Sequence, residues 1–366
     1  MQNVKTAYYE IEGSHYEIGR KIAQLTGKDL RAAPPEHFNE EEIEKALALY
    51  DQHCPGIKEE LIGFCDEVGM PLRENAFTWM SHLVPRCSGL ALLPPHTENG
   101  HILLGRNYEF SIEDEDFHVY RIAPTGKYAH IGGSLIEFGR SEGINECGLA
   151  VSLSSCGFPV SNIPGMREPA IQGLHFWIVL RSLLDNCKNI KEALNKLQEI
   201  PIAYNMNLLL ADREQNIALV ETMDGEMAIQ KGGNLGDSTF LCATNHIAID
   251  SFKNRESFAM RNSLVRYETI KKYVEHTKSI TEQGLKKFLL TKYPEGMTVW
   301  YYKDWFGTVK SVVMDVNEGK YSICWGGREE NGWDDYYVDK KIGNCEKEIT
   351  VINEPGNKEF FEVVPF

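Results

Sequence analysis

Apolar residues recur at helical spacing through the N-terminal part of the chain. Ile43, Ala46 and Tyr50 are separated by three and four positions, which is the pattern of a helix that buries one face. Patterns of this kind predict a short strand at residues 6–11 and helices at residues 15–23, 40–65 and 72–82. We therefore expect residues 1–86 to form a mainly helical segment.

From residue 87 the pattern changes to short apolar runs that are separated by turn residues. Residues 87–93 are typical of a buried strand, residues 94–100 predict a turn, and residues 101–105 return as a second strand. Further strands are predicted at residues 117–123, 128–132, 135–138 and 150–153. Consecutive strands joined by short turns favour a twisted antiparallel sheet.

Two pairs of helices interrupt the later strands. These helices are predicted at residues 173–186 and 190–198, and at residues 257–276 and 281–290. Strands are predicted between and after them, at residues 207–210, 217–222, 227–230, 240–243, 307–315 and 320–325. This order predicts an α+β protein, an αββα four-layer sandwich of two antiparallel sheets with helices outside. We expect residues 87–366 to form this core and the whole chain to be one compact domain.

The composition is that of a globular protein with an acidic surface. The 366 residues are 42% hydrophobic and 25% charged, and their formal net charge is −15. Because nucleic acids and anionic membranes attract surfaces rich in Lys and Arg, we expect neither as a partner. The apolar run at residues 174–180 is far shorter than a membrane-spanning helix of roughly 20 residues. The first residues lack the apolar core of a signal peptide, so we expect a cytoplasmic protein.

The sequence contains no pattern typical of a metal or nucleotide site. Its nine cysteines include no C-x-x-C pair, and their odd number argues against a disulfide framework. The eleven histidines form no H-E-x-x-H motif, and no P-loop, G-x-G-x-x-G or G-x-S-x-G segment is present. We expect neither a metal ion nor an organic cofactor.

Candidate chemistry is concentrated in the first predicted hairpin. Cys87 opens its first strand, and Arg106 and Glu109 close the second. A free thiol, with a pKa of about 8.5, needs a neighbouring base or cation to populate the attacking thiolate. This arrangement suits a cysteine that becomes the first residue of a chain and uses its own freed amine as the base.

This hairpin resembles the nucleophile hairpin of the N-terminal nucleophile (Ntn) amide hydrolases, specifically the choloylglycine hydrolase and isopenicillin N acyltransferase-like group. Four further segments resemble that group in the same order along the chain, at residues 13–20, 143–149, 242–246 and 305–315. The resemblance implies the αββα fold and an amidohydrolase or acyltransferase acting on a linear amide of an acylated small molecule. It also implies an autocatalytic cut before Cys87, which would make residues 1–86 a propeptide or small chain.

The resemblance also implies roles for individual residues. Cys87 would be the nucleophile, and its freed α-amine, with a pKa of about 7.7–8.0, would be the acid/base group. Arg106 would place a positive charge beside the sulfur, and Glu109 would hold the α-ammonium. Asn245, together with a backbone N–H at Ser155 or the residue before it, would stabilise the oxyanion.

A second arginine is expected on the helix that follows the oxyanion asparagine. The spacing from Ser263 to Arg266 fits the group better than the position of Arg261 does. Arg261 remains open as the alternative.

Three positions depart from the pattern of the group. Glu109 stands where the group usually has Asp, so its carboxylate lies one methylene farther from the backbone. Ser155 stands where bile-salt hydrolases have an asparagine. Arg86 precedes the bond that the resemblance implies is cut, where a smaller or acidic residue would be expected.

Two alternative functions remain open, a different kind of hydrolase and a binding protein without activity. A thiol hydrolase that pairs Cys87 with His175 or His246 would need no self-cleavage, although the papain-type C-G-S-C-W signature is absent. A binding protein of the same fold would have no activity, and Arg106 and Glu109 would then be an ordinary strand-end ion pair. The sequence leaves open the acyl group, the choice of water or an amine as acceptor, and whether the protein forms a homo-oligomer.

Overall fold

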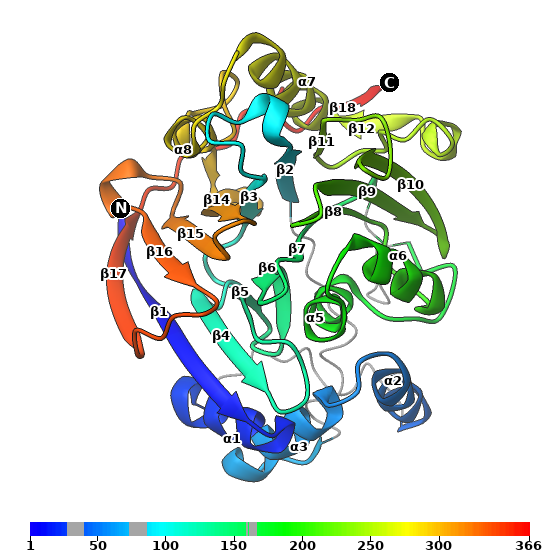
Figure 1. Ribbon diagram of the computed structural model, residues 1–366, viewed down its shortest axis with the longest axis vertical. Helices are drawn as coiled ribbons and strands as arrows, with labels where there is room; N and C mark the ends of the chain where they lie inside the picture. The colour runs from blue at the N-terminus through cyan, green and yellow to red at the C-terminus, as the bar shows by residue number, and fades with distance from the viewer. Residues whose placement is uncertain (28–39, 73–85, 159, 161–166) are drawn as a thin grey trace.

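A computed structural model describes residues 1–27, 40–72, 86–158, 160 and 167–366. Two β-sheets lie face to face between layers of helices (Figure 1). The first sheet has nine strands in the order β10-β9-β8-β7-β6-β5-β4-β1-β17. The second has the order β11-β2-β3-β14-β15-β16, and β13 pairs with β14.

The strand bounds follow the predicted apolar runs closely in most places. In the first sheet they are β1 Gln2–Gly13, β4 His118–Pro124, β5 His130–Leu135, β6 Gly139–Asn145, β7 Ala150–Ser155, β8 Met206–Asp212, β9 Asn216–Met223, β10 Glu226–Gly233 and β17 Cys345–Val351. In the second they are β2 Arg86–Leu92, β3 Leu103–Phe110, β11 Phe240–Ala243, β13 Trp300–Tyr301, β14 Phe306–Asp315, β15 Lys320–Trp325 and β16 Asp334–Tyr337.

Helices cover the outer face of each sheet. Helices α5 (Phe176–Asn186) and α6 (Ile190–Glu199) pack on the nine-stranded sheet, while α7 (Arg261–His276) and α8 (Glu282–Leu290) pack on the other. Because central strands are covered on both faces, every residue of β8 and β14 is buried. The predicted α+β four-layer class is confirmed. One strand pair differs from the expected antiparallel arrangement, since β1 runs parallel to β4.

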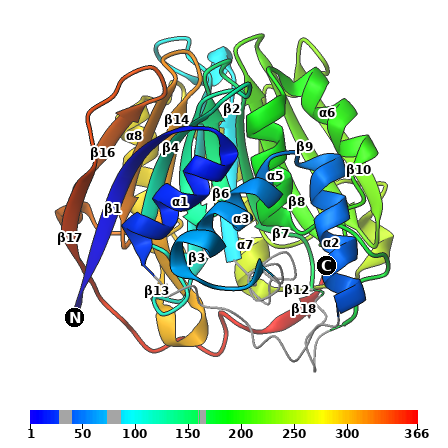
Figure 2. The ribbon, with the colours of Figure 1, turned by 90° about the horizontal axis from the view of Figure 1, so that it is seen from below.

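The N-terminal segment contributes a strand as well as helices. Strand β1 lies between β4 and β17 in the nine-stranded sheet, and α1 (His15–Thr26) packs against α3 (Ile57–Val68), as Figure 2 shows. The prediction of a single helix at residues 40–65 is wrong. The chain instead forms α2 (Glu40–His53) and α3, because Pro55 lacks an amide hydrogen and Gly56 has a φ of 107°. The helix predicted at residues 72–82 falls almost wholly outside the described residues.

Two further predictions failed, one at a tight turn and one at the start of a helix. The strand expected at residues 135–138 is wrong, because Ile136 and Glu137 adopt positive φ values of 53° and 58° in a tight turn that leads into β6. The helix predicted from residue 257 begins at Arg261, after the short strand β12 (Phe258–Met260), which pairs with β18 (Val363–Pro365). Among the described residues, no helix is long and apolar enough to cross a membrane.

Candidate active site

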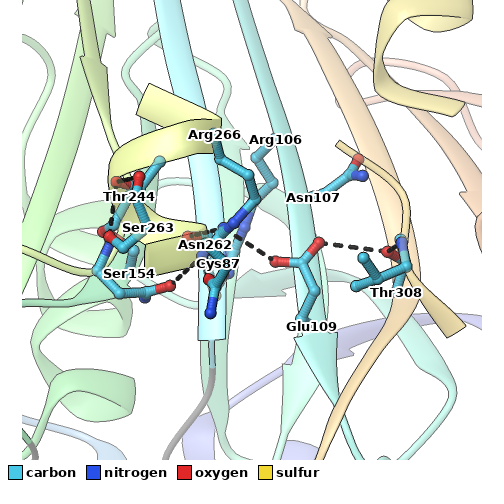
Figure 3. Close-up of polar contacts among 12 residues, drawn as sticks. Cys87, Arg106, Asn107, Glu109, Ser154, Thr244, Asn262, Ser263, Arg266 and Thr308 are labelled. Carbon is cyan, nitrogen blue, oxygen red and sulfur yellow. Dashed lines mark hydrogen bonds and ion pairs between the residues drawn. The ribbon is translucent and has the colours of Figure 1, made fainter. Parts of the chain in front are cut away.

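Cys87 lies in β2, which runs between β11 and β3 in the second sheet. Its side chain is fully buried, and its sulfur accepts a hydrogen bond from Arg106 Nη2 at 2.8 Å (Figure 3). Arg106 reaches it from opposite Gly89, which faces the same side of the strand as Cys87. A Cβ at Gly89 would stand 3.0 Å from Leu209 and 3.7 Å from Arg106. The glycine therefore leaves room for the guanidinium to lie along the strand toward the thiol.

Glu109 is buried on the face of β3 that is opposite to the face of Arg106. Thr308 Oγ1 donates to Glu109 Oε1 at 3.3 Å, and Arg266 Nη1 lies 3.7 Å from Glu109 Oε2. The second oxygen accepts no hydrogen bond from the residues that the structure describes. Burial raises the pKa of Glu109 to about 7, although Arg266 and Arg106 oppose the rise. The carboxyl group can therefore take up and release a proton near neutral pH.

Arg266 joins three parts of the site. From α7, its Nη1 donates to the backbone oxygen of Cys87 at 2.9 Å, and its Nη2 donates to Asn245 Oδ1 at 2.7 Å and to Asn262 Oδ1 at 2.8 Å. Arg261, at the start of the same helix, is instead partly exposed and pairs with Glu362. Of the two arginines that the sequence left open, Arg266 is the one beside Cys87.

Asn245 follows β11 and is held in one orientation. Because its Oδ1 accepts from Arg266, its Nδ2 faces β7, where it donates to Ser155 Oγ at 2.9 Å and to the Ser155 backbone oxygen at 3.3 Å. Its own backbone N–H donates to Ser263 Oγ at 2.8 Å. The amide group thus presents an N–H donor on the side of Ser155.

The thiol is protonated at neutral pH in the intact chain. Burial raises the pKa of Cys87 to about 11, and Glu109 adds to the rise while Arg106 counteracts it. Before Cys87, Arg86 lies opposite Glu109 in the strand register. Burial and the nearby Arg266 lower the pKa of Arg86. A base close to the sulfur is therefore needed to form the thiolate.

The six residues predicted as a site are thus brought together, and sequence reasoning missed others. Glu142 accepts from Arg106, Asn262 accepts from Arg266, and Thr308 donates to Glu109. Asn262 stands one helical turn before Arg266, a spacing that the sequence could have suggested. Glu142 and Thr308 gave no such signal, because their contacts depend on strand pairing. Within the described ranges, no group of three or more His, Cys, Asp or Glu residues could hold a metal ion.

Residues 96–330 match the family of acyl-coenzyme A:6-aminopenicillanic acid acyl-transferases. The chain belongs to this family. Membership makes the protein an enzyme of the Ntn class, an amide hydrolase or acyltransferase, and it confirms the resemblance seen in the sequence. The matched range contains Arg106, Glu109, Asn245 and Arg266, and it begins after Cys87.

Solved structures similar to this acyl-transferase family member include a hydrolase and an acylase. A variant of conjugated bile acid hydrolase from Clostridium perfringens shares 14% identity over 74% of this chain and 99% of its own, with a TM-score of 0.44. Penicillin V acylase from Agrobacterium tumefaciens shares 18% identity over 76% of this chain and 98% of its own, with a TM-score of 0.45. No curated protein matches the sequence significantly.

Proposed function

We propose that Cys87 is the nucleophile of an enzyme that cleaves or forms a linear amide bond of an acylated small molecule. The observation that carries the proposal is the contact of 2.8 Å between Arg106 Nη2 and the Cys87 sulfur in a buried site. A guanidinium at this distance stabilises the thiolate over the thiol. The thiolate attacks the acyl carbonyl, and water or an amine then takes the acyl group from the sulfur.

The base is the α-amine that a cut between Arg86 and Cys87 releases. Because Arg86 lies opposite Glu109 in the strand pairing, the new amine forms one position away from the Glu109 carboxylate. Its reference pKa of about 7.7–8.0 suits a group that accepts the thiol proton and later returns it to the leaving amine. Glu109 would hold the ammonium form, and the mature enzyme would consist of chains 1–86 and 87–366.

Asn245 supplies one donor for the oxyanion of the tetrahedral intermediate. Its Nδ2 faces the Ser155 end of β7, and the hydrogen bond of 2.7 Å from Arg266 to its Oδ1 fixes that orientation. The second donor is a backbone N–H at Ser155 or the residue before it. Preorganised donors of this kind cost no reorganisation when charge develops on the oxygen.

The substrate and setting follow from the family and the composition. The reacting partner is a small-molecule acyl amide or another acyl donor such as an acyl thioester, in keeping with the acyl-coenzyme A in the family's name. Nucleic acid and anionic membranes do not suit a net charge of −15. All nine cysteines are free thiols, which suits the reducing cytoplasm.

No specific observation favours the alternative of a Cys–His thiol hydrolase. His246 Nδ1 lies 2.7 Å from Ser263 Oγ, and burial lowers the pKa of His246 to about 4. His175 packs its ring against Tyr204, and burial lowers its pKa to about 4 as well. Imidazoles with such pKa values are weak bases at neutral pH.

Intact-mass measurement of the purified protein tests the proposal. We expect wild type to consist of two chains, 1–86 and 87–366, and to hydrolyse an acyl amide, whereas Cys87→Ala remains one inactive chain. Cys187→Ala is the matched control, since Cys187 is a buried thiol at the end of α5, outside the site, and it should still be processed. An intact wild type with full activity would refute the free-amine mechanism, and an intact, inactive wild type would favour a binding protein of this fold.

A further inference from the structure

The Arg106 guanidinium, which contacts the thiol, also forms a buried ion pair on its other side. Arg106 Nη1 donates to Glu142 Oε2 at 2.6 Å and also to the backbone oxygen of Ser141. Arg106 comes from β3 of one sheet and Glu142 from β6 of the other, and both side chains are fully buried. The guanidinium is thus held from the opposite sheet while its other terminal nitrogen faces the Cys87 sulfur.

The second oxygen of Glu142 is surrounded by donors. Tyr321 OH donates to Glu142 Oε1 at 2.8 Å, the Gly133 N–H donates at 3.2 Å, and Lys310 Nζ lies 4.0 Å away. Burial alone would raise the pKa of Glu142, but Lys310 and Arg106 lower it below its ordinary value. Glu142 is therefore ionised. Among the described residues, the hydrogen-bond partners of both Glu142 oxygens are donors. A glutamine in its place would replace one of these oxygens by an NH2 group, which cannot accept those hydrogen bonds.

The backbone is shaped to admit this carboxylate. A Cβ added at Gly133 would stand 2.2 Å from Glu142 Oε1 and 2.7 Å from Lys310 Nζ. Any side chain at Gly133 would therefore push Glu142 or Lys310 aside. Lys310 is itself tied to the buried Glu115 at 2.9 Å, so it has little freedom to yield.

We propose that Glu142 is a positioning residue that holds Arg106 against the Cys87 sulfur and thereby promotes formation of the thiolate. The inference rests on the proposed function, in which Cys87 is the nucleophile. It adds a residue that touches neither the sulfur nor the substrate and acts only through Arg106.

Two effects of Glu142 oppose each other. Its negative charge disfavours a second negative charge on the sulfur, and its hydrogen bond keeps the favourable Arg106 in place. The other charged or titratable groups around Glu142 are Lys310, Tyr108, Glu115 and Tyr321. Those around the sulfur are Arg86, Tyr108, Glu109, Tyr204 and Arg266. The positioning effect dominates, because Arg106 contacts the sulfur directly whereas Glu142 lies behind it.

Titration of the Cys87 thiol separates the two effects. The ultraviolet absorbance of the thiolate is followed against pH, with the same protein carrying Cys87→Ala subtracted. We expect Glu142→Gln to raise the thiol pKa by about one unit, which lowers the thiolate fraction at neutral pH about tenfold. The value of kcat should fall by about the same factor while KM stays within a few-fold. If charge repulsion dominated, the thiol pKa of Glu142→Gln would fall instead, and a fall or an unchanged value overturns the proposal.

Two further variants keep the test valid if Glu142→Gln fails to fold. Gly133→Ala keeps the charge but displaces the carboxylate, and Tyr321→Phe removes one donor that fixes it. Both should raise the thiol pKa, and an unchanged pKa in both overturns the proposal. The control is Glu137→Gln, since Glu137 is a buried carboxylate that accepts from His118 and Tyr120, and it should leave the thiol unaffected.

The titration needs no substrate, so its outcome is independent of the proposed function. If wild type shows no turnover while the Glu142 variants shift the thiol pKa as expected, the positioning role stands and the proposed reaction fails. If turnover and processing occur as proposed but the thiol pKa does not respond to Glu142, only the positioning role fails.

Discussion

Replacing Glu109 by Gln is expected to make the intact protein more stable and the enzyme less active. The carboxyl group is fully buried, and one of its oxygens accepts no hydrogen bond from the described residues. Its nearest cation is Arg266, at 3.7 Å. An ionised carboxylate in such surroundings has lost its water without full compensation, so the folded chain holds the proton more tightly than the unfolded chain.

The size and sign of the effect follow from the pKa. The difference between about 7 in the folded protein and the ordinary value of 4.5 corresponds to roughly 3 kcal/mol. Because the folded pKa is the higher one, this stability is fully present below about pH 4.5 and is lost as the pH rises through about 7. A glutamine does not titrate. Glu109→Gln should therefore exceed its parent in free energy of unfolding by up to roughly 3 kcal/mol at pH 8, and by much less at pH 5.

Urea unfolding at both pH values measures the difference in a Cys87→Ala background, which is expected to stay one chain. Asp237→Asn, at an exposed carboxylate, is the control and should change stability equally at pH 5 and pH 8. In the enzyme with Cys87 present, Glu109→Gln should lower the initial rate of acyl-amide hydrolysis more than Glu109→Asp, which keeps the charge. Equal stability of Glu109→Gln and its parent at pH 8 would refute the burial reasoning, and an unchanged rate would refute the role of Glu109 in holding the ammonium.

Two further predictions concern the oxyanion side of the site. Asn245→Ala should lower kcat by roughly 10²–10³-fold with KM within a few-fold, measured by steady-state kinetics; a raised KM at unchanged kcat would make Asn245 a substrate-binding residue instead. Arg266→Lys should lower kcat strongly, because one ammonium cannot reproduce the three hydrogen bonds to Cys87, Asn245 and Asn262. Arg261→Lys is its matched control on the same helix, and equal effects of the two variants would contradict the assignment.

The β2–β3 hairpin that carries Cys87 could be predicted because its signals are local. A continuous apolar run, a turn with prolines and a second run specify β2 and β3, and pairing then sets Arg106 opposite Gly89. In a hairpin, the length and type of the turn fix the register of the two strands. The position of Arg266 rested on its spacing along one helix, and the structure places it beside Cys87.

The parts that could not be predicted depend on contacts between distant segments. Strand β6 reads Gly-Arg-Ser-Glu-Gly-Ile-Asn, and its polar residues give no strand pattern, yet every residue in it is buried. Glu142 is tolerated there only because Arg106, Lys310 and Tyr321 arrive from three strands of the other sheet. A buried charge of this kind is specified by the assembled fold and not by its neighbours in sequence.

Arg86 was unexpected before the proposed cleavage site, and the buried charges of the intact chain give a physical reason for it. Arg86 is partly buried, and both burial and the nearby Arg266 lower the pKa of its guanidinium. Opposite it, Glu109 keeps one oxygen without a hydrogen bond from the described residues. A cut after Arg86 would free that cation to leave the site, and it would create an ammonium beside the Glu109 carboxylate. The proposed cut would relieve both unfavourable features of the intact chain in one step, and an arginine at this position would then favour the cleaved state.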